Sequence, residues 1–87
     1  QQRFDWFAAR LAERADCYRV DELVEKLETK AVWPGQWEKA AVMLALKGTP
    51  EATGALEGLD TSQRSNSFRA LYDKCLAEAY SRIRQAA

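Results

Sequence analysis

Residues 33–60 read WPGQWEKAAVMLALKGTPEATGALEGLD, and the positions of proline and glycine in this stretch predict a helical hairpin. Pro34 suits the first turn of a helix, because the N–H that proline lacks would have no intrahelical partner there. Gly48 suits the left-handed residue that closes a helix. Thr49 can then cap a second helix, with Pro50 at its first position. Chains built from paired helices typically present a surface to another protein.

The rest of the chain also has apolar residues at helical spacing. The spacing predicts five helices, over residues 4–17, 20–31, 35–47, 50–59 and 67–85. The third is apolar around most of its circumference, which predicts a central position in the fold. No run of β-branched residues alternates with polar ones, so no strand is predicted. The expected fold class is all-α, a five-helix bundle of helical hairpins that forms one domain over residues 1–87.

Composition narrows the function classes. The 87 residues carry 13 basic and 13 acidic side chains, so no overall charge attracts the chain to nucleic acid or to an acidic membrane. The longest apolar run is far shorter than the ~20 residues of a membrane span, and we expect neither a transmembrane helix nor a secretory leader. Two cysteines 58 residues apart do not fit a disulfide-rich secreted scaffold, which favours a cytoplasmic location.

Residues suited to catalysis are few. The chain has no histidine, so it cannot build a Ser/His/Asp triad, a Cys/His dyad or a histidine-based zinc site. Cys17 and Cys75 border apolar stripes, which predicts that both are small buried hydrophobes. The acidic residues between 16 and 28 lack the spacing of a calcium loop and are interpreted as a solvated helix face. We therefore expect no enzyme activity, no cofactor and no metal site.

The three tryptophans are the main candidates for function. Trp6 lies roughly 200° around its helix from Phe4, away from the apolar stripe. Either a partner or another helix of the same chain could cover it, and the sequence leaves both open. Trp33 and Trp37 are four residues apart. They are expected to stack on one face and hold the second and third helices together.

One segment resembles a known family. Trp33, Pro34, Trp37, Ala41, Leu44, Leu46, Gly48, Ala55, Leu56, Leu59, Ser62, Gln63 and Phe68 form a pattern over about residues 33–68. This pattern resembles the C-terminal half of the small tetratricopeptide-like chaperones that hold needle subunits in bacterial type III secretion systems. The chain departs from that family at Ala45 and Leu46 and over its N-terminal third. The same segment is similar to one HEAT-type repeat, and both resemblances imply helical hairpins that bind protein.

These observations predict a non-enzymatic helical adaptor or small chaperone. A concave face between the third and last helices is expected to bind an amphipathic segment of a partner protein. The candidate partner-binding residues are Trp6, Trp37, Leu44, Arg69, Leu71, Tyr72, Lys74, Tyr80 and Arg82. One alternative is nucleic-acid binding through basic residues of the last helix and the loop before it. Another is a structural domain whose partner is the rest of a larger protein.

Overall fold

The computed structural model describes residues 2–86, which form five α-helices and one short 3₁₀ helix. In chain order they are α1 (Gln2–Leu11), the 3₁₀ helix η1 (Arg14–Cys17), α2 (Val20–Glu28), α3 (Gln36–Lys47), α4 (Pro50–Glu57) and α5 (Asn66–Ala86). This part of the chain contains no strand, which confirms the all-α prediction. No helix within it is both long enough and apolar enough to cross a membrane.

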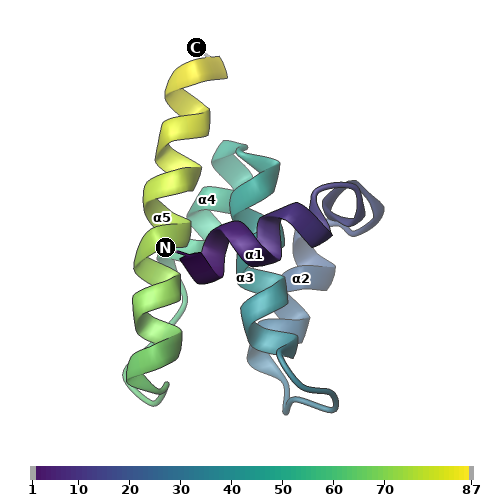
Figure 1. The fold of residues 1–87 in the computed structure, drawn as a ribbon, viewed down its shortest axis with the longest axis vertical. Coiled ribbons are helices and arrows are strands. Elements are labelled where there is room, and N and C mark those ends of the chain that lie inside the picture. Colours follow the sequence, from purple (N-terminus) through teal and green to yellow (C-terminus); the bar gives the residue numbers. More distant parts are fainter. Residues whose placement is uncertain (1, 87) are drawn as a thin grey trace.

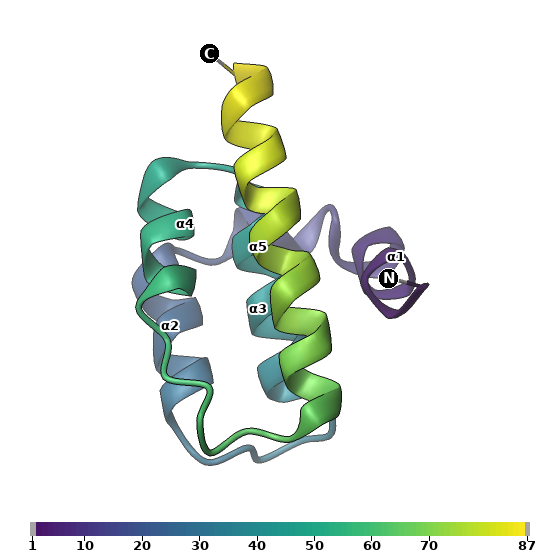
Figure 2. The same ribbon diagram turned by 90° about the vertical axis from the view of Figure 1, so that its left-hand side faces the viewer.

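Helix α3 is the centre of the fold, as its composition predicts. It contacts each of the other four α-helices, and every residue from Ala40 to Ala45 is buried. Helix α5 packs alongside α3, while α1 runs across both of them (Figures 1 and 2). The C-terminal end of α5 extends beyond the other helices (Figure 2). The core is therefore built around one apolar helix that its neighbours cover from several sides.

The first helix is shorter than predicted. The apolar spacing predicted one helix over residues 4–17, but α1 ends at Leu11 and the chain turns before η1 begins at Arg14. No proline or glycine marks this break. The tighter winding of η1 buries Ala15 against the core, so tertiary packing overrides local helix propensity here. The second helix also stops early, at Glu28.

The hairpin from α3 to α4 confirms three of the predicted caps. Gly48 ends α3 in the left-handed region with a φ of 61°. The Thr49 hydroxyl accepts a hydrogen bond from the Ala52 N–H at 3.2 Å, and Pro50 occupies the first turn of α4. The prediction for Pro34 is wrong, because α3 begins two residues later. Gly35, at a φ of 76°, makes the turn into that helix.

Side chains from later segments satisfy the C-terminal end of α2, where backbone carbonyls lack intrahelical partners. The donors are Gln36 Nε2 to the Lys26 carbonyl (3.0 Å), Arg64 Nη2 to the Leu27 carbonyl (2.6 Å) and Trp37 Nε1 to the Thr29 carbonyl (2.9 Å). The Arg64 guanidinium also lies 4.6 Å from the centre of the Trp37 ring. Trp37 thus connects α2 with α3 as predicted, but through a hydrogen bond and a cation rather than through Trp33.

Candidate functional site

The concave face predicted between the third and last helices is not open to a partner, because the two helices pack against each other there. Leu44 is fully buried, and Leu71 and Tyr72 are only 3% and 8% exposed, because α3 and α5 pack directly against each other. The Tyr72 hydroxyl donates to the Leu56 carbonyl inside this packing. These three candidate residues belong to the core of the chain itself and offer no surface to a partner. Trp37 is partly buried, and its indole N–H already donates to the Thr29 carbonyl at the end of α2.

Two candidate cations of α5 have polar partners within the chain, whereas Arg82 Nε is buried without a hydrogen bond in the described structure. Arg69 donates to the Asn66 side chain, and Lys74 lies 3.3 Å from the Glu78 carboxylate. The stem of Arg82 packs against the turn at Gly48. A row of basic residues on α5 therefore presents fewer free charges to phosphates than the sequence indicates, although these side chains keep part of their surface in water.

Tyr80 is the candidate residue of α5 that remains exposed, with 39% of its surface accessible. Its hydroxyl donates to the Glu57 carboxylate of α4. Tyr80 lines none of the three pockets described in this structure. It is therefore an exposed aromatic side chain that lies outside them.

A different surface combines exposed aromatic rings with positive charge. Two adjoining pockets, of about 490 and 330 Å³, share Leu11, Arg14 and Lys39 as walls. Together they form what we call the aromatic–basic groove. Its full lining is Trp6, Phe7, Arg10, Leu11, Arg14, Tyr18, Trp33, Pro34, Lys39 and Met43. Of the predicted candidates, the groove contains Trp6 alone.

The groove is formed where segments distant in the sequence meet. Helix α1, the start of η1 and Tyr18 just after η1 supply one part of the lining, and the loop before α3 together with Lys39 and Met43 of α3 supplies the rest. Leu11 and Met43, each 4% exposed, come from α1 and α3 and connect the groove to the core. The buried side of each helix therefore anchors the groove, while its rings and charges lie at the surface.

Each exposed tryptophan in the groove lies beside a cation. The Arg10 guanidinium is 3.9 Å from the centre of the Trp6 ring and also donates to the Trp6 carbonyl at 3.1 Å. Lys39 Nζ is 5.0 Å from the centre of the Trp33 ring. Phe7 meets Trp6 edge to face, with the ring centres 5.1 Å apart. These contacts hold the aromatic rings in place while their remaining faces are open to water.

The charge of the groove is one-sided. Its lining contains the three cations Arg10, Arg14 and Lys39 and no carboxylate. Over the described side chains, none of the three forms a salt bridge. In a chain of zero net charge, this gives one surface a local charge of +3. Such a surface attracts carboxylates or other anions and repels cations.

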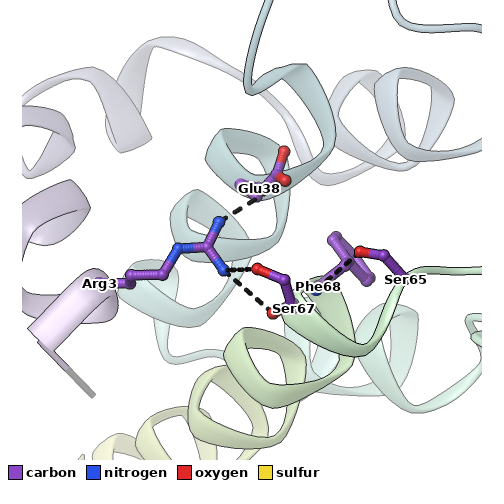
Figure 3. Close-up of polar contacts among 5 residues, drawn as sticks. All are labelled: Arg3, Glu38, Ser65, Ser67 and Phe68. Carbon is purple, nitrogen blue, oxygen red and sulfur yellow. Dashed lines mark hydrogen bonds and ion pairs between the residues drawn. The ribbon is translucent and has the colours of Figure 1, made fainter.

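A polar clamp holds α1 as one wall of the groove. Arg3 Nη1 donates to the carbonyl and the hydroxyl of Ser67 at 3.0 and 2.6 Å, and Arg3 Nη2 lies 3.7 Å from the Glu38 carboxylate (Figure 3). In the same view the Ser65 hydroxyl accepts from the Phe68 N–H and caps the start of α5 (Figure 3). The N-terminal turn of α1 is therefore tied to both α3 and α5.

Sequence reasoning missed most of the groove. Trp33 was expected to stack on Trp37 in the core, yet it is 37% exposed, and the two rings do not form an aromatic pair in the described chain. The reason is that α3 begins at Gln36, so Trp33 precedes the helix and does not share its face. For Trp6, one of the two alternatives is wrong: the residue is 52% exposed, so no other helix within residues 2–86 covers it.

A third pocket, of about 560 Å³, is less suited to one kind of ligand. Its lining mixes both charges: Asp16, Asp21 and Glu51 with Arg19 and Lys47, beside Val20 and Thr49. Arg19 and Asp21 already pair at 3.1 Å. Because opposite charges cancel there and no aromatic side chain is present, the aromatic–basic groove is the better candidate site.

The two cysteines differ, so the prediction of two buried thiols is half wrong: Cys75 is buried and Cys17 is exposed. Burial raises the pKa of the Cys75 thiol to about 12. We expect one thiol, that of Cys17, to react with an aromatic disulfide reagent near pH 8, and the second only after denaturant is added. Absorbance of the released thiolate follows both steps, and C17S should abolish the first. Rapid modification of two thiols in the folded chain would contradict this arrangement.

Comparison with known proteins adds no assignment. No family model matches the chain, and neither a curated protein nor a solved structure matches it. Within residues 2–86, no group of three or more cysteine or carboxylate side chains is placed to hold a metal ion. The function must therefore be inferred from the geometry of the groove.

Proposed function

We propose that this chain is a non-enzymatic protein-interaction module, a helical adaptor or small chaperone, and that it binds a segment of another protein in the aromatic–basic groove. The observation that carries the proposal is the exposure of Trp6 and Trp33 at 52% and 37% beside three cations that no carboxylate neutralises. Large exposed aromatic side chains reduce solubility, and tryptophan and arginine are enriched where binding energy concentrates.

The physical basis of binding follows from the lining. A bound segment would remove the faces of both tryptophan rings from water and gain about 25 cal/mol for each Å² of apolar surface buried. Leu11 and Met43 at the base are packed into the core, so little side-chain entropy is lost there on binding. The cations would contribute more to the choice of partner than to affinity.

The resemblance to needle-subunit chaperones supports the same class of function. In this proposal the hairpin of α3 and α4 corresponds to one tetratricopeptide-like or HEAT-like repeat, and the chain acts in the cytoplasm on a secreted helical protein. The walls of the groove come from α1, α3 and the loop before α3, and α4 contributes no residue to its lining. The partner would then bind between α1 and α3 rather than between α3 and α5.

A peptide library displayed on phage tests this proposal without knowledge of the partner. Peptides selected on the unaltered chain should bind the double variant W6A/W33A at least about tenfold more weakly, because the exposed rings supply most of the apolar contact. The same peptides should bind Y80A unchanged, since Tyr80 is about as exposed as Trp33 but lies outside the groove. Circular dichroism should show equal helix content in all three proteins.

Two results would reject the proposed function. One is selection of peptides that bind W6A/W33A as tightly as the unaltered chain. The other is loss of binding in Y80A alone, which would place the binding surface on α5, where the sequence analysis expected it.

A further inference from the structure

We infer that the occupant of the aromatic–basic groove is an acidic amphipathic helix, with large apolar side chains on one face and aspartate or glutamate beside them. This inference rests on the proposed function and specifies the chemistry of the partner. The observation that supports it is that Arg14 and Lys39 line both adjoining pockets beside aromatic and aliphatic side chains, with no acidic side chain in either lining.

The charge of the groove selects an acidic partner. Arg10 and Lys39 each lie against a tryptophan ring, and Arg14 makes neither a hydrogen bond nor a salt bridge through its side chain in the described structure. Arg14 is also exposed, so its guanidinium can turn toward a ligand. Carboxylates of a partner would therefore meet three cations that form no ion pair with a carboxylate of the described chain.

The two pockets indicate how the apolar side chains of the partner are spaced. One pocket lies between Tyr18 and Trp33, the other beside Trp6, and both share the wall made by Leu11, Arg14 and Lys39. Neighbouring pockets suit neighbouring anchors on one face, which a helix supplies at i and i+3 or i+4. Carboxylates of the partner helix that are adjacent in sequence to these apolar side chains would then lie near Arg14 and Lys39.

A helix fits this surface better than an extended strand. An added strand gains affinity by hydrogen bonding to an open sheet edge, and residues 2–86 contain no sheet. A helix satisfies its own backbone groups and needs only side-chain contacts from the groove. The pocket lining offers such contacts, because it consists of side chains from α1, η1, Tyr18 after η1, the loop before α3 and α3.

Three synthetic peptides test the inference. They share leucine and phenylalanine at heptad positions a and d, and their remaining positions carry glutamate, lysine or glutamine. Tryptophan fluorescence of the protein at about 0.05 M salt reports binding through Trp6 and Trp33. We expect the glutamate peptide to bind at least about tenfold more tightly than the lysine peptide, with the glutamine peptide between them.

Charge reversal in the groove locates the effect. R14E/K39E should weaken binding of the glutamate peptide at least about tenfold and strengthen binding of the lysine peptide. The matched control K30E/R84E changes the net charge equally at two exposed positions outside the groove and should leave both affinities within about twofold. Glutamate near the N-terminus of α3 suits the helix dipole, so the variant should stay folded.

The outcomes separate this inference from the proposed function. If the lysine or glutamine peptide binds as tightly as the glutamate peptide and W6A/W33A removes that binding, the acidic partner is rejected while the protein-interaction role stands. If none of the peptides binds, the helix inference is rejected, and the phage selection decides the proposed function separately. Tighter groove-dependent binding of oligothymidylate than of any peptide would reject both.

Self-association is the remaining outcome. If dilution alone changes the tryptophan emission, and sedimentation shows a dimer that R14E/K39E dissociates, then a second copy of the chain occupies the groove. That result would overturn the inference of a separate acidic partner.

Discussion

The substitution Leu44→Ala is expected to lower the free energy of unfolding by about 2–5 kcal/mol. Leu44 is fully buried in α3, the helix that all other α-helices contact, so its removal leaves a cavity that few neighbours can fill. Domains of this size have total stabilities of about 5–15 kcal/mol, so the variant should lose a large share of its stability. Urea unfolding followed by circular dichroism measures the change.

Leu46 is the matched control for this experiment. It lies two residues away in the same helix but is only partly buried. L46A should cost about 1 kcal/mol, because less apolar surface is lost and water already reaches the site. Equal losses in the two variants, or no loss in L44A, would mean that Leu44 faces solvent or a partner as the sequence analysis supposed.

The second large effect is expected at Gly48, where G48A should destabilise the fold by about 2–4 kcal/mol. A left-handed φ of 61° costs a residue with a side chain about 1–2 kcal/mol. The added methyl group would also lie 2.7 Å from Cβ of Arg82, an atom close to the backbone that cannot swing away. Helix α5 would have to shift to relieve this overlap. Thermal and urea unfolding both measure the loss.

Substitutions at two other glycines show how much of the loss in G48A comes from the left-handed φ and how much from the overlap with Arg82. Gly35 has a φ of 76°, but its added methyl group would approach only Lys39 Cε, at 3.7 Å, so G35A should cost only the backbone strain of about 1 kcal/mol. Gly54 lies within α4 and has no atom within 4 Å of the added position, so G54A should stabilise by about 0.5–1 kcal/mol. If G48A costs no more than G35A, the close packing of α5 on this turn is wrong.

Much of the fold could be predicted because its signals are local. The hairpin of α3 and α4 is determined by Gly48, Thr49 and Pro50, whose effects act within a few residues. The central position of α3 follows from its apolar circumference. By contrast, the end of α1 depends on how Ala15 packs against residues distant in the sequence. No proline or glycine near Leu11 indicates that the helix stops there.

The site could be predicted only in part, for a different physical reason. Periodicity shows that Leu44, Leu71 and Tyr72 share apolar faces, but not whether the chain itself or a partner covers those faces. The groove combines residues from five segments, and their proximity arises only when α1 crosses α3. Trp6 can be recognised as a candidate from the sequence, because it lies outside the apolar stripe of its own helix. Trp33 was misplaced because a glycine turn delays the start of α3.

The clamp at Arg3 has a consequence for how the groove behaves over time. Helix α1 has only ten residues, and it packs mainly on α3 and α5. Its amide protons should exchange with deuterium through local detachment, well before those of α3, which require global unfolding. A ligand that touches both walls can bind only while α1 is attached, so its binding energy adds to the cost of detachment. When a ligand occupies the groove, amide exchange should therefore slow along the whole of α1, including residues that the ligand does not contact.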